Sequence, residues 1–377
     1  MKNAIVKAIK KETVLCIACI LALVSMFFVH PDKQYIDYID VRTLIILFCL
    51  MAVVAGLKEL GLFDYIAQKL LKRIHRMWQV ALVMVLFCFL FSMVITNDVA
   101  LITFVPLCII ILGCIGEEQK KKWLIPIVAM QTVAANLGSM LTPIGNPQNL
   151  YLYGQAKMGV GEFVQLMLPY TLFALLLLLV WIACSFVKEK GSGQFSIHLS
   201  SEKKVEQVPK CLAYFVLFVV CLLTVAHLMP VPVSFGLVLV FTLLFDRRIL
   251  RKVDYSLLGT FVGFFIFIGN LGRIPAFSQF LSNAMEGREI VTSVLASQVM
   301  SNVPAALLLS GFTDNYSLLI IGTNLGGLGT LIASMASLIS FKYVAKEDKD
   351  LRGKYLLYFT ISNVVFLGCY FLFLRLM

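Results

Sequence analysis

Charged residues are scarce in this sequence: Asp, Glu, Lys and Arg make up 14% of its 377 residues, against about 25% in an ordinary soluble domain. Hydrophobic residues make up 60%. Too few polar side chains remain to cover a water-soluble fold, and so apolar a composition also excludes a disordered chain. Several runs reach the roughly 20 apolar residues that a membrane helix needs. We therefore expect an all-α polytopic membrane protein whose main surroundings are the lipid bilayer.

Motifs of ATP-driven pumps and of common membrane enzymes are also missing. The sequence contains no Walker P-loop, no HExxH and no GxSxG. We therefore expect neither an enzymatic activity nor a cofactor. Lys and Arg outnumber Asp and Glu by 32 to 21, an excess typical of the cytoplasmic loops of membrane proteins. Nucleic acid is therefore not an expected partner.

Apolar runs predict nine membrane segments, at 13–29, 41–57, 123–157, 164–187, 211–229, 231–246, 255–271, 317–341 and 355–377. Two further apolar stretches, 78–115 and 290–312, each contain a polar break. If both are re-entrant hairpins, all but six of the 32 Lys and Arg fall on one side. A full two-helix hairpin over the first stretch would give the same sidedness. Because basic loops are cytoplasmic, we expect a plasma-membrane protein of the prokaryotic inner-membrane type, with its N-terminus inside and its C-terminus outside.

The order of these elements occurs twice along the chain. The first set spans 1–187, with a hairpin at 78–115 and a broken helix at 123–157. The second spans 231–377, with a hairpin at 290–312 and a broken helix at 317–341. A cytoplasmic linker and connecting helix, 188–230, joins them. Because the two sets start from opposite sides of the membrane, we expect an inverted-topology repeat, an architecture of many secondary transporters.

Short polar motifs recur at matching places in the two sets. Thr96-Asn97-Asp98 matches Ser301-Asn302-Val303. Asn136, Gly138, Thr142 and Asn146 match Asn324, Gly326, Thr330 and Ser334. Broken helices expose backbone groups that suit anions and Na⁺, so we expect the substrate at the midplane, between the hairpin tips and the breaks. The candidate contacts are Thr96, Asn97, Asp98, Asn136, Gly138, Thr142, Gly145, Asn146, Asn149, Ser301, Asn302, Asn324, Gly326, Gly329, Thr330 and Ser334.

Asp98 is the one carboxylate that the sequence places deep in an apolar segment. Ionised and unpaired, it would cost several kcal/mol there. It is therefore expected to be neutral, to bind a cation or to meet a hydrogen-bond donor. We expect H⁺ or Na⁺ as the coupling ion, with Na⁺ near Asn97, Asp98 and Asn302. The alternative is a structural carboxylate that caps the helix beginning near Val99.

These motifs resemble those of the ion transporter superfamily. The resemblance lies in TND followed by VALITFVPL, in NLGSMLTPIGNPQNL, in SNVPAALLL and in GTNLGGLGT, so it covers nearly the whole chain. It is closest to the branch of arsenite efflux pumps and sodium/proton antiporters, often grouped with citrate-transporter-like domains. In the related sodium-coupled dicarboxylate transporters, each tip carries Ser-Asn-Thr, which binds substrate carboxylate. Asn97 and Asn302 match that motif, as do Thr96 and Ser301, but the final Thr is missing from both tips.

The resemblance implies a secondary active transporter that moves a small anion (carboxylate or oxyanion) or a metalloid by ion-coupled alternating access. Arsenite or antimonite efflux and Na⁺/H⁺ antiport are the alternatives within that class, and symport and antiport both stay open. A passive channel is the rival from another class, although two blind-ended hairpins make an awkward pore. Members of the dicarboxylate branch are elevator-type dimers, which implies a homodimer.

Overall fold

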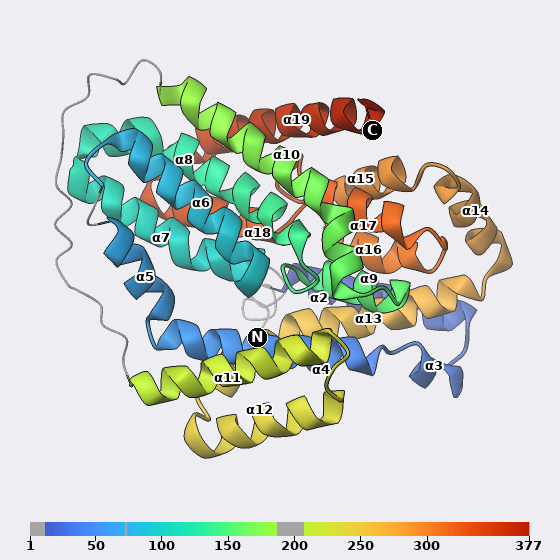
Figure 1. Ribbon diagram of the computed structural model, residues 1–377. Helices are drawn as coiled ribbons and strands as arrows, with labels where there is room; N and C mark the ends of the chain where they lie inside the picture. Colours follow the sequence, from blue (N-terminus) through green and yellow to red (C-terminus); the bar gives the residue numbers. More distant parts are fainter. Residues whose placement is uncertain (1–11, 72–73, 187–206, 377) are drawn as a thin grey trace, which may run out of the picture.

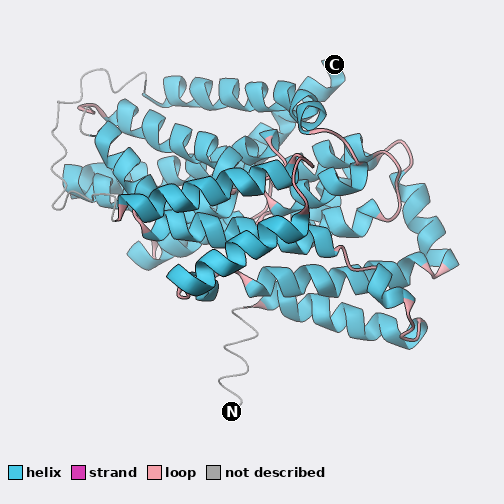
Figure 2. Ribbon diagram, turned by 60° about the horizontal axis from the view of Figure 1, so that its bottom comes forward, coloured by secondary structure: helices cyan, strands magenta, loops and turns pink. Residues whose placement is uncertain are grey.

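The computed structural model describes residues 12–71, 74–186 and 207–376, so part of the expected linker lies outside the described residues. Within these ranges the chain forms helices joined by loops, with no strand (Figure 2). Eight of the helices are long and apolar enough to cross a membrane. The expected all-α polytopic membrane protein is confirmed at this level.

The first half of the chain contains a hairpin of two long helices among its other helices. Its elements are α2 (Thr13–Phe28), α3 (Gln34–Asp37), α4 (Val41–Glu59), α5 (Leu62–Leu71), α6 (Met77–Ile95), α7 (Asn97–Ile115), α8 (Glu117–Gly138), η1 (Ser139–Leu141), α9 (Pro147–Ala156) and α10 (Val160–Phe186). Helices α6 and α7 have 19 residues each, or about 28 Å. Each is therefore about as long as the hydrocarbon core is thick.

The second half contains a hairpin of much shorter helices. Its elements are α11 (Val208–Val225), α12 (Val231–Phe245), η3 (Ile249–Lys252), α13 (Tyr255–Gly272), α14 (Pro275–Met285), α15 (Glu289–Met300), α16 (Asn302–Ser310), α17 (Tyr316–Leu325), α18 (Met335–Glu347) and α19 (Leu351–Leu376). Helices α15 and α16 have 12 and 9 residues, or about 18 and 14 Å. Neither is long enough to cross a bilayer alone.

Both helices that were expected to be broken are interrupted. Helix α8 ends at Gly138 and α9 begins at Pro147. The side chain of Asn146 caps α9 by accepting from the Asn149 N–H at 3.0 Å, and Pro147 fits the first turn because its missing N–H is not needed there. Helix α17 ends at Leu325 and the next helix, α18, begins ten residues later.

The helices form two layers (Figure 1). Helices α2, α4, α11, α12 and α13 pack on one another in one layer. Helices α6, α7, α8, α10, α18 and α19 pack together in the other, and α9 packs with α16 and α17 beside them. The layers meet where α4 contacts α9 and where α13 contacts α16.

Ion pairs join loops that the charge pattern places on the same side of the membrane. The Lys120 ammonium lies 2.8 Å from the Glu347 carboxylate, and both belong to loops expected inside. The Arg273 guanidinium lies 2.8 Å from the Asp32 carboxylate, in loops expected outside. The contacts agree with the grouping of the loops, whereas the identity of the cytoplasmic face stays a prediction.

Candidate functional site

The tip of the first hairpin is docked onto the break between α8 and α9. Asn97 donates its backbone N–H to the Gly145 carbonyl at 3.0 Å, and the Thr142 hydroxyl donates to the Met93 carbonyl. Thr96 joins α6 to α7 with φ 74° and ψ 151°, a region that residues other than glycine rarely enter. The tip is therefore held in an unusual conformation by the loop it contacts.

The second hairpin repeats this arrangement at the residues matched from the sequence. Ser301 has φ 76° and ψ 154°. Asn302 donates its backbone N–H to the Ala333 carbonyl at 2.9 Å, and the Thr330 hydroxyl donates to the Gln298 carbonyl at 3.3 Å. The same three backbone features therefore occur at both tips.

Glycines in the two breaks allow the hairpins to approach closely. A Cβ on Gly138 would lie 2.6 Å from the Ser92 hydroxyl and 2.1 Å from the Phe89 carbonyl oxygen. A Cβ on Gly326 would lie 2.4 Å from the hydroxyl of Ser297, the residue at the same distance before its tip. Gly145 and Gly329 are likewise crowded, by the Ser139 carbonyl and by the Gln298 side chain. The space beside these glycines, which was expected to admit ligand, is filled by protein.

Asparagine side chains connect the first tip to both breaks. Asn136 Oδ1 accepts from Asn97 Nδ2 at 3.2 Å and from the Ser334 hydroxyl at 3.0 Å. Asn136 Nδ2 donates to the Gly327 carbonyl at 3.4 Å. Because Asn136 precedes the first break and Ser334 ends the second, this network joins the two halves of the chain.

A second set of amides joins the same two breaks. Asn324 Nδ2 donates to Asn149 Oδ1 at 2.6 Å, and Asn146 Nδ2 donates to Asn324 Oδ1 at 3.3 Å. Asn149 Nδ2 donates to the carbonyls of Ser139 and Thr142, both at 3.3 Å. The structure thus brings most of the predicted amides into one buried polar centre.

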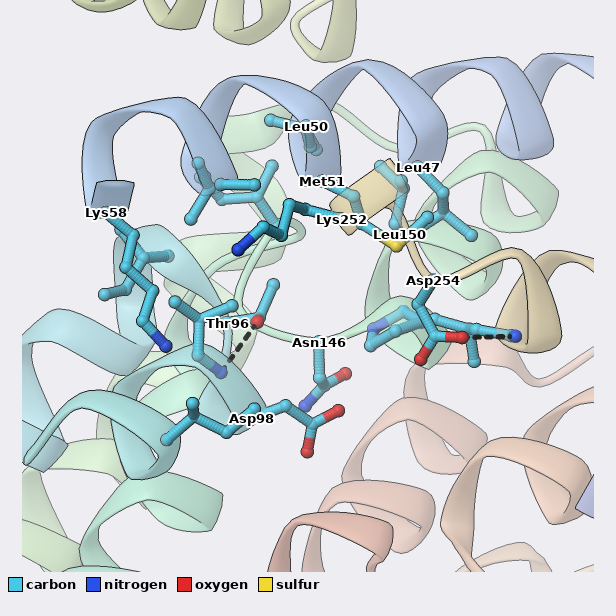
Figure 3. A pocket seen from close by; sticks show the side chains of 18 of the residues that line it. Leu47, Leu50, Met51, Lys58, Thr96, Asp98, Asn146, Leu150, Lys252 and Asp254 are labelled. Carbon is cyan, nitrogen blue, oxygen red and sulfur yellow. Dashed lines mark hydrogen bonds between the residues drawn. The ribbon is translucent and has the colours of Figure 1, made fainter. Parts of the chain in front are cut away.

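A cavity of about 500 Å³ reaches this centre from one face. Thr96, Asp98 and Asn146 line its deep end (Figure 3). Its wall is apolar and comes mainly from α4, with Leu47, Leu50 and further residues of the same helix face. The cavity therefore extends between α4 and the first hairpin tip.

The Asp98 carboxylate has no hydrogen-bond or ion-pair partner among the described residues. The Thr96 hydroxyl, not Asp98, accepts from the Val99 N–H at 3.5 Å and so caps α7. The cap interpretation of Asp98 is therefore wrong. Asp98 instead lies half-buried at the cavity.

Charged residues at the cavity were not foreseen from the sequence. Lys58, Lys252 and Asp254 line it (Figure 3), as does Glu59, whose carboxylate lies 3.0 Å from the Lys252 ammonium. The rule that basic loops are cytoplasmic accounts for the positions of these residues in the sequence, so no sequence pattern assigned them to a site. Only the packing of α4 against η3 and α13 reveals that these loop residues share a cavity with Asp98.

The second tip does not line this cavity. Ser301 and Asn302 are buried. Gly329 and Thr330 line a separate apolar cavity of about 250 Å³ between α15 and α19. The two tips, which were expected to enclose one substrate site, are joined through the asparagine network and not through a shared cavity.

Two broken helices, two hairpin tips and a cavity open to one face are the architecture of a membrane transporter. The chain belongs to the citrate transporter family, whose sequence profile matches residues 4–316. It is 32% identical over 323 residues to the uncharacterised transporter MJ0456 of Methanocaldococcus jannaschii, covering 85% of each chain. It is also 32% identical over 343 residues to the inner membrane protein YbiR of Escherichia coli, covering 89% of this chain and 87% of that one.

A more distant relative has a named substrate. The silicon efflux transporter LSI3 of Oryza sativa is 29% identical over 174 residues, which are 45% of this chain and 33% of that protein. Together the comparisons and the fold assign this chain to the multi-pass membrane transporters, rather than to the enzymes.

Proposed function

We propose that this protein is a secondary active transporter that couples a small anion or a metalloid to H⁺ or Na⁺ by alternating access. The observation that carries the proposal is the Asp98 carboxylate, which lines a cavity and has no hydrogen-bond or ion-pair partner among the described residues. A carboxylate there can take up a cation from one side and release it on the other when the cavity changes the face to which it opens.

The alternating-access mechanism rests on the matching geometry of the two halves. The tip conformations at Thr96 and Ser301 agree within a few degrees, which supports an inverted repeat with two hairpins of equivalent function. The cavity is lined by residues at the ends of α4 and η3, next to loops that carry much of the basic charge. We therefore infer an inward-facing state with a cytoplasmic N-terminus, in the homodimer that the superfamily resemblance implies.

An anionic substrate is supported by two lysines. Lys58 and Lys252 line the cavity and offer ammonium groups to an anion, although Lys252 is already paired with Glu59 at 3.0 Å. The description of the family as citrate transporters points the same way. Citrate, other carboxylates and oxyanions are therefore the first substrates to test.

A neutral metalloid hydroxide is the second candidate, because the cavity has no excess of positive charge. Four acidic residues line it beside the two lysines: Glu12, Glu59, Asp98 and Asp254. An uncharged solute such as arsenous or silicic acid avoids repulsion by these carboxylates. The superfamily resemblance to arsenite pumps and the name of the rice relative favour the same chemistry.

Flux into proteoliposomes tests the proposal. Purified protein is reconstituted, and uptake of citrate, succinate, sulfate, phosphate, arsenite, antimonite and silicic acid is measured under a pH gradient and under a Na⁺ gradient. We expect saturable, gradient-driven uptake of one solute class, and counterflow of labelled solute, which a passive channel does not give. Uptake of Na⁺ against a pH gradient with no solute would assign Na⁺/H⁺ antiport instead.

The variant Asp98→Asn tests the coupling role. It keeps the size of the side chain and removes its charge, so we expect binding of solute to persist and gradient-driven accumulation to be lost. Asp37→Asn is the matched control, because Asp37 is exposed at the end of α3, outside the cavity. Unchanged accumulation by Asp98→Asn would refute the role of this carboxylate.

A further inference from the structure

A second cavity, of about 690 Å³, lies at the opposite ends of the helices that line the first. The N-terminal end of α13 lines the first cavity through Leu257, and its C-terminal end lines the second through Ile268. Helix α9 lines the first through its first residue, Pro147, and the second through Gln155, near its C-terminal end. The second cavity therefore belongs to the other membrane face, where α14 and α15 meet (Figure 1).

Acidic and neutral oxygen atoms dominate the lining of this second cavity. Glu286, Glu289 and Asp314 contribute carboxylates, and hydroxyl and amide side chains, including Ser310, lie among them. No Lys or Arg occurs among the described residues that line it. Arg288 is exposed nearby and is not part of the lining, and Lys157 lines a neighbouring hollow that also includes Asp314.

Glu289 is the residue that points to a ligand. Its side chain is only 7% exposed, and its Oε2 atom is buried without a hydrogen-bond partner. A buried carboxylate that lacks a partner is costly unless a proton or a cation compensates it. Its position as the first residue of α15 offsets only a small part of that cost through the helix dipole.

The C-terminal end of α16 adds negative potential at the same place. This helix ends at Ser310, whose hydroxyl lies 2.9 Å from the Tyr151 hydroxyl. Carbonyls in the last turn of a helix carry partial negative charge, although here those of Leu307, Leu309 and Ser310 already accept from the Ser310 hydroxyl, the Phe312 N–H and the Tyr316 hydroxyl. Carboxylate, hydroxyl and carbonyl oxygens are the ligands that hard cations prefer.

One buried carboxylate among neutral oxygens suits a monovalent ion better than a divalent one. Within the described ranges no three His, Cys, Asp or Glu side chains are close enough together to hold a metal ion as a group, as a divalent site rich in carboxylates would require. Na⁺ is bound in transporters by few carboxylates together with helix-end carbonyls. Glu289 and the C-terminal end of α16 line the same cavity.

We propose that Glu289 and the neutral oxygens around it bind Na⁺ in this second cavity, and that Glu286 and Asp314 raise the local concentration of cations. As a route for a coupling ion, the site rests on the transport function proposed above. As a binding site, it stands independently of transport.

Equilibrium binding of ²²Na⁺ to the purified full-length protein tests this proposal, with choline replacing Na⁺ at constant ionic strength. We expect Glu289→Gln to lower the affinity for Na⁺ at least tenfold. Asp37→Asn, which removes a carboxylate from the same face outside the cavity, is expected to bind as the wild type does. Saturable Na⁺ binding that is unchanged in Glu289→Gln, or no Na⁺-specific binding by the wild type up to about 150 mM, overturns the proposal.

Thermal stability in the same buffers separates a binding role from a structural one. Na⁺ is expected to raise the melting temperature of the wild type, because a ligand of the folded state stabilises it, and not that of Glu289→Gln. In choline, Glu289→Gln is expected to melt at least as high as the wild type, because an unpaired buried charge has been removed. Equal destabilisation of the variant in both buffers would mean that Glu289 is structural, which overturns the proposal.

The variant Asp98→Asn separates the coupling role of Asp98 from Na⁺ binding at Glu289. Loss of coupled flux in Asp98→Asn with Na⁺ binding intact supports both a coupling role for Asp98 and a separate site at Glu289. Intact flux in Asp98→Asn, with Na⁺ binding lost in Glu289→Gln, refutes only the coupling role.

Discussion

Replacing Thr96 by glycine is expected to stabilise the protein, although it removes a side chain from the hairpin tip. The backbone of Thr96 has φ 74° and ψ 151°, a combination that is essentially restricted to glycine. A β-branched residue there is strained, and the strain persists only because the surrounding contacts hold it. Thr96→Gly removes the strain, whereas Thr96→Ala keeps it.

The magnitude follows from three contributions. Relief of the strain is worth about 1–3 kcal/mol. Loss of the hydroxyl that caps α7 costs only a few tenths of a kcal/mol when glycine replaces threonine, but about 1 kcal/mol when alanine does. Glycine lowers the stability by about 0.5–1 kcal/mol, because it gives the unfolded chain more conformational freedom. Thr96→Gly is therefore expected to be about 1–3 kcal/mol more stable than Thr96→Ala.

Melting of the purified variants in detergent measures this difference. Ser301→Gly and Ser301→Ala form a second pair, because Ser301 has the same conformation without a side-chain cap. The effects at the two tips are expected to add, because Thr96 and Ser301 share no hydrogen-bond partner. The reasoning is refuted if Thr96→Gly melts below Thr96→Ala.

Two further predictions concern a crowded glycine and a histidine. Gly138→Ala is expected to destabilise the protein by about 3 kcal/mol or more, because its Cβ would lie 2.1 Å from the Phe89 carbonyl oxygen. Gly113→Ala is the control, because a Cβ there meets no atom within 4 Å. Similar yields of monodisperse protein from the two variants would contradict the prediction. His227 Nδ1 lies 2.7 Å from the Arg42 guanidinium, and burial together with the Arg42 charge lowers the pKa of His227. The folded state therefore favours neutral His227. The stabilisation that this gives is fully present above about pH 6.5 and is lost as the pH falls through the lowered pKa of His227. His227→Gln should make the melting temperature depend less on pH between pH 7.5 and 5. An unchanged dependence on pH would argue against this role of His227.

The helices and the breaks were predictable because lipid leaves the chain few choices. A backbone in hydrocarbon must satisfy its own polar groups, so apolar runs become helices and Gly/Pro-rich polar stretches become breaks. The glycine-rich stretch before α18 has no proline, and the helix is nevertheless interrupted between Leu325 and Met335. The matched motifs also predicted which residues take equivalent positions at Thr96 and Ser301.

The lining of the cavity was not predictable from local patterns. Lys58 and Asp254 lie far apart in sequence and come together only through the packing of α4 near α13. The roles of glycines such as Gly138 were also missed, because a sequence shows that a Cβ is absent but not which atom fills the space. Here Ser92 of the neighbouring hairpin fills it.

The position of α9 has an electrical consequence. This helix has ten residues, or about 15 Å, and its two ends line the two cavities. Where water enters both cavities, most of the membrane voltage falls across that short distance. An ion that moves only the length of α9 then crosses most of the field, which is worth about 2.3 kcal/mol per charge at 100 mV. If the proposed transport moves net charge along this path, its rate is therefore expected to depend on the membrane voltage.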